Sequence, residues 1–385
     1  MTQGVGLPEP PRPGASSKTP VNRKKLTMRR TLHFFLFLIS LILVGDVARA
    51  DKPTVIRIAV PSVGIGNRPI IGGSPIANIG LRGMMEDEFR ADGIRIQWTY
   101  LPGAGPAVNE LFANGLADFG GGLGDLPSIV GKAGGLKTKL LAAAGIRQHT
   151  YLAVPADSQI RTIEDLRGKQ VAYQKGTNIQ LAVAKIIAAH GLTEHDFRAV
   201  NMDNETAKSA IITHSVDAAF GQYDYLQLRD QGTARIIYVA NGEDNPSFLK
   251  HSTLIASEEF INKYPEITER VVKVLVQAAK WQSDQDANPG PLYQLWTKSG
   301  VPFNDWREDL QKNSVKQLAS PLVDDYIRAQ YKRAVDDSKR FGLIRNTFDV
   351  DSWVDTSFLQ KALHELNLEN YWPQYDASGK VRGSS

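Results

Sequence analysis

The chain has 385 residues, 42% of them hydrophobic, a formal net charge of +4 and no cysteine. The absence of cysteine excludes disulfides, thiolate metal sites, cysteine nucleophiles and a lipid-modified cysteine anchor. A chain of this length buries enough core to fold without disulfides and normally divides into two domains.

The positive charge is concentrated at the N-terminus. Residues 1–50 hold eight lysines and arginines and two acidic residues. The rest of the chain therefore carries 37 basic and 39 acidic side chains, a net charge of −2. We expect no nucleic-acid partner, because such a surface needs a clustered basic face.

The order of residues at the N-terminus is typical of a secretory signal peptide. A basic stretch at 23–30 precedes an apolar run at 34–44, and Ala48-Arg49-Ala50 places small residues before a cut at Asp51. The apolar run is too short to span a bilayer as a helix, although an uncleaved anchor is the alternative. We expect residues 1–50 to be a cleaved leader and the mature protein to be periplasmic.

Short apolar runs alternate with helical patterns after the leader. Strands are predicted at 55–60, 94–98, 117–120, 139–143, 170–173, 218–221 and 236–240. Helices are predicted at 78–91, 107–114, 126–133, 179–190, 205–213 and 225–231, followed by long amphipathic helices at 266–283 and 320–341. The alternation predicts an α/β fold with two successive units, about 54–148 and 160–245, each built on a parallel sheet.

Glycine-containing loops follow five of the predicted strands, where open α/β sheets bind their ligands. These loops are 61–74, 101–106, 120–125, 174–178 and 221–224. Each can bring backbone N–H groups and a helix N-terminus to one edge of the sheet, which favours an anion. In any single loop, the glycine can simply close a turn, and Asp125, Thr177 or Asn178 can simply cap a helix. Five loops at matching places favour a binding cleft.

Three motifs occur in order along the chain. They are Trp98-Thr99-Tyr100-Leu101-Pro102 with Gly103, Pro106 and Gly124-Asp125-Leu126-Pro127; the segment 163–177, which contains Asp165-Leu166-Arg167-Gly168-Lys169 and Lys175-Gly176-Thr177; and Val216-Asp217-Ala218-Ala219. Together they resemble the aliphatic sulfonate/nitrate/taurine branch of the ABC-transporter periplasmic substrate-binding proteins. The similarity extends from about residue 55 to residue 265.

The resemblance implies a type-II periplasmic-binding-protein fold, in which two α/β lobes joined by two hinge strands close on a ligand. The first lobe would comprise 51–150 and 257–385, with a helical C-terminal tail packed on it. The second lobe would comprise 151–256, with crossing strands at 151–155 and 252–257.

The resemblance also implies the substrate-binding component of an ABC importer, with permease and ATPase subunits as partners. A small anionic organic ligand is expected: an aliphatic sulfonate first, then nitrate or a carboxylate. We expect a monomer without cofactor or metal. A sensor receptor and an enzyme similar to pyrimidine-precursor synthases are the alternatives on the same fold. Asp224 and His251 could form an acid–base pair, but no nucleophile accompanies them.

The loops that should identify the ligand depart from the family pattern. Leu123 stands where the family often has a hydroxyl residue, and the loop 61–74 is long and adds Arg68. Arg147 could pair with a sulfonate or carboxylate, or could form an inter-lobe salt bridge instead. The candidate ligand-binding residues are Asn67, Arg68, Gly103, Gly124, Asp125, Arg147, Lys175, Gly176, Thr177, Asn178, Gln222, Tyr223 and Asp224.

Overall fold

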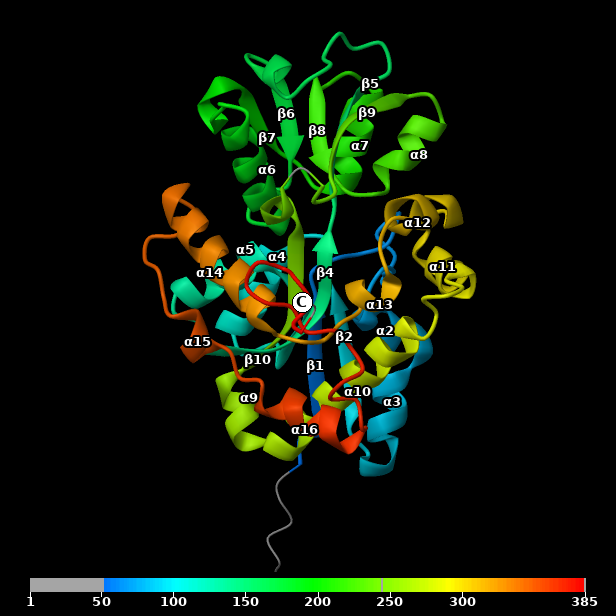
Figure 1. Cartoon of the computed structure of the whole chain (residues 1–385), viewed down its shortest axis with the longest axis vertical. Coiled ribbons are helices and arrows are strands. Elements are labelled where there is room, and N and C mark those ends of the chain that lie inside the picture. Colours follow the sequence, from blue (N-terminus) through cyan, green and yellow to red (C-terminus); the bar gives the residue numbers. More distant parts are fainter. Residues whose placement is uncertain (1–51, 244, 384–385) are drawn as a thin grey trace, which may run out of the picture. The chain divides into compact units, whose positions relative to one another are not determined.

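Two five-stranded sheets organise the protein in the computed structural model, which describes residues 52–243 and 245–383 (Figure 1). The first sheet has the order β2-β1-β3-β10-β4 and the second β7-β6-β8-β5-β9. The predicted leader, residues 1–50, lies outside the described residues. The strands are β1 (Val55–Val60), β2 (Arg95–Tyr100), β3 (Phe119–Gly124), β4 (Thr138–Gln148), β5 (Thr150–Pro155), β6 (Gln170–Tyr173), β7 (Arg198–Asn201), β8 (Ala218–Gly221), β9 (Ala234–Ala240) and β10 (Lys250–Ser257).

The two sheets share one topology. In the first, β1 is parallel to β2 and β3, and in the second β6 is parallel to β7 and β8, as the strand–helix alternation predicts. The next strand in each order, β10 or β5, is antiparallel to its neighbours. Each of these two strands enters its sheet directly after the chain has left the other sheet.

Helices connect the strands and then form the C-terminal tail. Within the two sheet units they are α2 (Pro75–Arg82), α3 (Met84–Phe89), α4 (Ala104–Ala113), α5 (Asp125–Ala133), α6 (Asn178–Ala189), α7 (Asn204–Ile212) and α8 (Tyr225–Asp230). The tail contains α9 (Glu258–Lys263), α10 (Pro265–Ser283), α11 (Gly290–Trp296), α12 (Phe303–Leu310), α13 (Val315–Leu318), α14 (Asp325–Arg340), α15 (Val350–Trp353) and α16 (Ser357–Glu365). Short 3-10 turns lie at Arg90–Asp92, Glu164–Leu166, Glu194–Asp196, Pro246–Phe248 and Thr297–Ser299.

The tail buries both faces of the first sheet. On one face, Val271 and Leu275 of α10 pack in the same cluster as Ile56 and Ile58 of β1. On the other face, Tyr331 of α14 packs in a cluster with side chains of β3, β10 and α5. Complete burial of each such apolar side chain stabilises the fold by roughly 1.5–3 kcal/mol. The expected packing of the tail on the first lobe is therefore confirmed.

Two of the predicted helices have different boundaries in the structure. The helix expected at 78–91 is divided because Gly83 adopts φ 65°, which ends α2 and begins α3. The helix expected at 320–341 begins only at Asp325, because Asp324 accepts the N–H of Ile327 (3.0 Å) and caps the first turn there.

The segment 120–125, predicted as a loop, is mostly strand. Residues 119–124 form β3, which pairs with both β1 and β10. The missing side chains allow close packing: a Cβ on Gly121 would lie 3.3 Å from Ile58 and Ile76. The strand therefore runs directly into α5.

The crossings between the sheets also differ from the prediction. Residues 151–155 already lie in β5 of the second sheet, and residues 252–257 lie in β10 of the first. The chain therefore passes to the second sheet at His149 and returns between Ala240 and Lys250.

Candidate ligand-binding site

A cavity of about 230 Å³ lies between the two sheets, where the parallel strands of both end. Residues that follow β1, β2, β6, β7 and β8 line it, together with the last residues of β3 and β4. This is the edge at which open α/β sheets bind ligands. The helical tail contributes Ser299, Val301, Trp306, Asp309, Leu310 and Leu318 to the lining.

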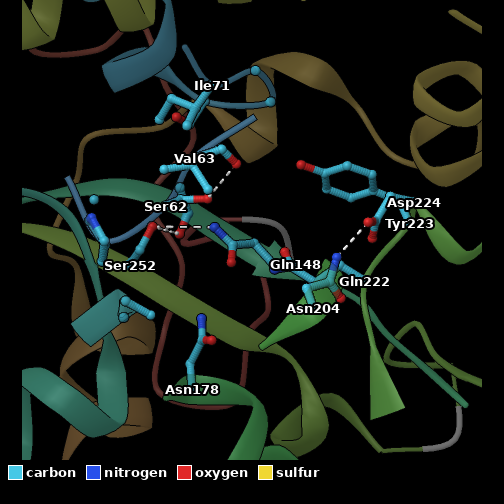
Figure 2. A pocket seen from close by; sticks show the side chains of 18 of the residues that line it. Ser62, Val63, Ile71, Gln148, Asn178, Asn204, Gln222, Tyr223, Asp224 and Ser252 are labelled. Carbon is cyan, nitrogen blue, oxygen red and sulfur yellow. Dashed lines mark hydrogen bonds between the residues drawn. The ribbon is translucent and has the colours of Figure 1, made fainter. Parts of the chain in front are cut away.

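One wall of the cavity is polar and uncharged (Figure 2). Gln148, at the end of β4, donates from Nε2 to Oγ of Ser252 (3.2 Å), and that hydroxyl donates to the carbonyl of Gly145 (3.1 Å). Ser62 and Asn178 point into the same space. The amide of Asn178 has no side-chain hydrogen bond within residues 52–243 and 245–383, so it is available to a ligand.

Helix N-termini face the cavity from both lobes. The first residues of α2, α4, α5, α6 and α7 are part of its lining or directly follow it. Thr177 caps α6 by accepting the N–H of Ile179 (3.3 Å). Gly103 and Gly124 precede α4 and α5 and offer no capping side chain, although Oδ1 of Asp125 accepts the N–H of Leu126 in the first turn of α5. Because uncapped N–H groups and the helix dipole both favour negative charge, this arrangement suits a bound anion.

The second lobe supplies the opposite wall, with Asn204, Gln222, Tyr223 and Asp224 (Figure 2). Asp224 accepts hydrogen bonds from Nδ2 of Asn204 and from Nζ of Lys208 (3.1 Å), while burial raises the pKa of this carboxyl group. Burial also raises the pKa of Tyr223 well above its ordinary value, so the phenol stays neutral. Its hydroxyl points into the cavity and makes no hydrogen bond with the part of the chain that the structure describes.

Arg147 and its neighbour His149 lie where the chain leaves β4, and both contact the tail, although Nε and Nη2 of Arg147 are buried without a hydrogen-bond partner among the described residues. Arg147 lines the cavity, but its guanidinium carbon lies 4.3 Å from the ring centre of Tyr326 and 5.1 Å from that of Tyr375. His149 contacts Asp309 through Nδ1 (3.0 Å) and Asn313 through Nε2 (3.2 Å). Arg147 therefore forms cation–π contacts with the tail, and within residues 52–243 and 245–383 it makes no inter-lobe salt bridge.

The structure brings eight of the thirteen sequence-predicted residues to the cavity. These are Asn67, Gly124, Arg147, Thr177, Asn178, Gln222, Tyr223 and Asp224. The other five, Arg68, Gly103, Asp125, Lys175 and Gly176, lie outside its lining.

Local packing explains why three of these five do not reach the cavity. Asp125 is buried, and its Oδ1 accepts the N–H of Leu126 (2.7 Å). Lys175 forms an ion pair with Glu194. Gly176 allows a close approach between the lobes, because a Cβ there would lie 2.7 Å from Cγ of Pro106.

Several residues that line the cavity were not predicted from the sequence. Ser62 lies in a loop that was identified, but nothing in the motifs distinguishes it from its neighbours. Gln148 could have been inferred from its place between Arg147 and His149. Trp306 and Leu310 of α12 could not, because only the tertiary fold brings the tail to the cavity.

The acid–base pair considered from the sequence does not form. Asp224 is engaged by Lys208, whereas Nδ1 of His251 accepts the backbone N–H of Arg147 (3.4 Å). Burial lowers the pKa of His251 to about 3, so the imidazole is neutral. Among the residues described, no cluster of metal-ligating side chains occurs. No helix in that part of the chain is long and apolar enough to cross a membrane.

Comparison with known proteins places the chain in a family. It matches the family described as "NMT1/THI5 like" over residues 89–287, just over half of its length. A Bacillus subtilis protein named for binding aliphatic sulfonates is 29% identical over 296 residues, covering 76% of this chain and 86% of that protein.

Solved structures show the same fold. The structure named as the periplasmic sulfonate-binding protein SsuA of a Methylobacillus flagellatus ABC transporter aligns with a TM-score of 0.71 and 30% identity, covering 85% of this chain and 98% of that chain. The nitrate-binding protein NrtA of Synechocystis aligns with a TM-score of 0.64 and 13% identity over 86% and 96% of the two chains, which supports the fold alone. The expected type-II periplasmic-binding fold is thus confirmed, and the chain belongs to the NMT1/THI5-like family of periplasmic binding proteins.

Proposed function

We propose that this protein is the substrate-binding component of an ABC importer and that it captures an organic sulfonate. The observation that carries the proposal is the convergence of helix N-termini and neutral side-chain donors on one cavity between two lobes. The names of its sulfonate-binding relatives point to the same ligand class.

Neutral donors suit a sulfonate. Such a group keeps its negative charge throughout the physiological pH range, so its three oxygens accept hydrogen bonds without needing a proton. The side-chain amides of Asn178 and Gln148 supply donors, and the helix N-termini of α4 and α5 face the same space. Fixed helix dipoles stabilise an anion, and the guanidinium of Arg147, which lines the same cavity, adds a full positive charge.

The size of the cavity favours an organic anion over nitrate. A water molecule needs about 10–15 Å³ on the same volume scale. The cavity of about 230 Å³ therefore holds on the order of ten or more groups of that size. Nitrate, with four heavy atoms, would leave most of this space to water, whereas a sulfonate with a carbon substituent can fill it.

Contacts between the lobes support capture by closure. Nε2 of Gln174 in the second lobe donates to the carbonyl of Pro102 in the first (3.2 Å). A Cβ on Gly124 would lie 3.0 Å from Asn178, so the lobes approach closely beside the cavity. A ligand that contacts both lobes would stabilise this closed arrangement, which permease and ATPase partners could recognise.

Periplasmic location and binding without catalysis belong to the same proposal. The predicted leader and the periplasmic relatives support the location. His149, which lines the cavity, contacts Asp309, and His251 accepts a hydrogen bond from the backbone. Neither imidazole is therefore free to act as a base. A monomer that delivers its ligand to an importer is the simplest assembly consistent with these features.

Calorimetry with a ligand panel tests the proposal. Methanesulfonate, ethanesulfonate, benzenesulfonate, nitrate and acetate are titrated into the purified protein. At least one sulfonate should bind, and should raise the unfolding free energy by about 2.7 kcal/mol at one hundred times its dissociation constant. Binding of nitrate or acetate with no sulfonate bound would contradict the proposal. A permease and an ATPase encoded beside the gene would support an importer, and a histidine kinase in their place would support a sensor.

A further inference from the structure

One end of the cavity is apolar. Val63 and Ile71 point into it from the loop between β1 and α2, and Tyr223 extends toward them from the second lobe with its hydroxyl foremost (Figure 2). The remaining apolar lining at this end comes from Ile65, Val301, Trp306 and Leu310. The cavity is thus amphipathic, with uncharged donors at one end and hydrocarbon and aromatic rings at the other.

Trp306 holds this apolar end in place. Its ring centre lies 4.3 Å from that of Tyr223 and 5.2 Å from that of Trp296, and the side chain is 1% exposed. The backbone of the β1–α2 loop lies directly on the indole, because a Cβ on Gly72 would be 2.6 Å from Cζ2 of Trp306. Aromatic rings in such contact form a rigid surface that loses little side-chain entropy on binding.

The apolar end belongs to a hydrophobic core, which keeps its shape. Trp306 and Val301 are buried members of a cluster with Leu292, Tyr293 and Trp296, and Tyr223, Ile65 and Leu310 pack against it. Because cores are close-packed, a void at their surface keeps its outline and favours a substituent of matching size.

We propose that the cleft selects sulfonates with a bulky apolar group, aryl or branched alkyl, over short-chain sulfonates, and that Trp306 and Tyr223 are the residues that determine this selectivity. This inference rests on the proposed function, since it places the sulfonate at the polar wall. The apolar group then occupies the space between Val63 and Ile71 on one side and Tyr223 on the other. The selecting tryptophan comes from α12 of the tail, outside every motif that marks the family in this chain.

Asp309 of α12 also lines the cavity, close in sequence to Trp306 and Leu310. The hydroxyl of Tyr151 (2.7 Å) and Nδ1 of His149 (3.0 Å) engage its Oδ1. The pKa of Tyr151 is raised by burial and by this carboxylate, so the phenol stays protonated and continues to donate. A sulfonate placed beside Asp309 would be repelled, whereas a neutral hydrocarbon group would not.

The test compares methanesulfonate with benzenesulfonate and cyclohexanesulfonate by calorimetry on the purified protein. Each buried methylene-sized group contributes about fourfold in affinity, so both ring compounds should bind at least roughly tenfold more tightly than methanesulfonate. Equal affinities for the three would overturn the inference and leave the proposed function intact. Failure of all three to bind would overturn the proposed function itself.

Substitutions identify the selecting residues. Trp306→Ala should weaken benzenesulfonate binding by at least roughly tenfold while changing methanesulfonate binding less than about twofold. Trp281→Ala is the matched control, because this tryptophan packs against the same hydrophobic cluster but does not line the cavity. Equal losses for both ligands in Trp306→Ala would overturn the assignment.

A milder substitution covers the case in which Trp306→Ala fails to fold. Ile71→Ala removes three carbons from the opposite side of the same space, and Ile71 is only partly buried where it packs against the core. It should narrow the preference for benzenesulfonate over methanesulfonate by severalfold. An unchanged preference in the folded Ile71→Ala protein would overturn the inference.

Discussion

Replacement of Lys250 by methionine should remove a pH-dependent contribution to stability at the return passage between the lobes. Lys250 begins β10 and is 1% exposed, and its Nζ donates to the carbonyl of His149 on the other passage. Burial lowers its pKa from 10.5 to about 8, an effect that Asp309, Asp125 and Asp224 oppose.

The direction of the pH dependence is set by how many protons the folded and unfolded states of the protein bind. Between pH 8 and 10.5 the unfolded chain holds the proton on Lys250 and the folded protein does not, so stability rises with pH across this window. Below pH 8 both states are protonated, and the folded state bears the full penalty of a buried ammonium group. At 1.36 kcal/mol per pKa unit, the penalty is roughly 3 kcal/mol.

The assay is urea denaturation at closely spaced pH values from 7 to 10.5. The difference in unfolding free energy between Lys250→Met and the parent should change by roughly 3 kcal/mol across the range, in favour of the parent at high pH. At pH 7 the variant gains from removal of the buried charge but leaves the His149 carbonyl without its donor, a loss of about 1–3 kcal/mol. Lys298→Met, at an exposed position, is the control. Parallel profiles for Lys250→Met and the parent would refute the reasoning.

Two further substitutions probe the polar wall and the contact between the lobes. Gly145→Ala should reduce sulfonate affinity at least roughly tenfold, because the added Cβ would lie 2.9 Å from both Nε2 of Gln148 and Oγ of Ser252. Calorimetry measures the affinity, and an unchanged value would show that this wall does not contact the ligand. Glu308→Gln breaks the two-point ion pair that α12 makes with Arg229 of the second lobe. Because these side chains are 35% and 40% exposed, the affinity for every sulfonate should fall by less than about fivefold, and by less still in high salt. A loss of affinity for one sulfonate alone would contradict an effect through closure of the lobes.

The strands and their surrounding helices could be predicted from local patterns where the pattern is strong. β1, β6 and β8 occupy the residues expected from their short apolar runs. β3 was predicted at 117–120 and lies at 119–124, because four of its six residues are glycine, which carries no hydrophobic signal and is disfavoured in strands on average. Its strand conformation comes from pairing with β10, more than 120 residues later, which no local pattern can show.

Residues of the candidate site could be predicted where a loop follows a strand. Residues that the C-terminal tail contributes to the cavity could not be predicted. Asn178, Gln222 and Tyr223 follow strands whose carboxyl ends the sheet topology directs to the cavity, and all three line it. Arg147 was found at the right position, but its pairing with Tyr326 depends on where α14 packs. Whether a charged side chain faces a ligand or an aromatic ring is decided by tertiary contacts.

The shared strand order of the two sheets has a consequence for how the chain folds from its N-terminus onward. All five strands of the second sheet lie within one continuous segment, 150–240, so that sheet can form as soon as this segment is available. The first sheet cannot be completed before β10 is available, because β10 lies between β3 and β4 and pairs with both. Until residue 257 has emerged, β3 and β4 each present an unpaired edge, which is the state most open to intermolecular pairing. Sequence-local contacts thus favour early formation of the inserted lobe, and the lobe that begins the chain is the last to be finished.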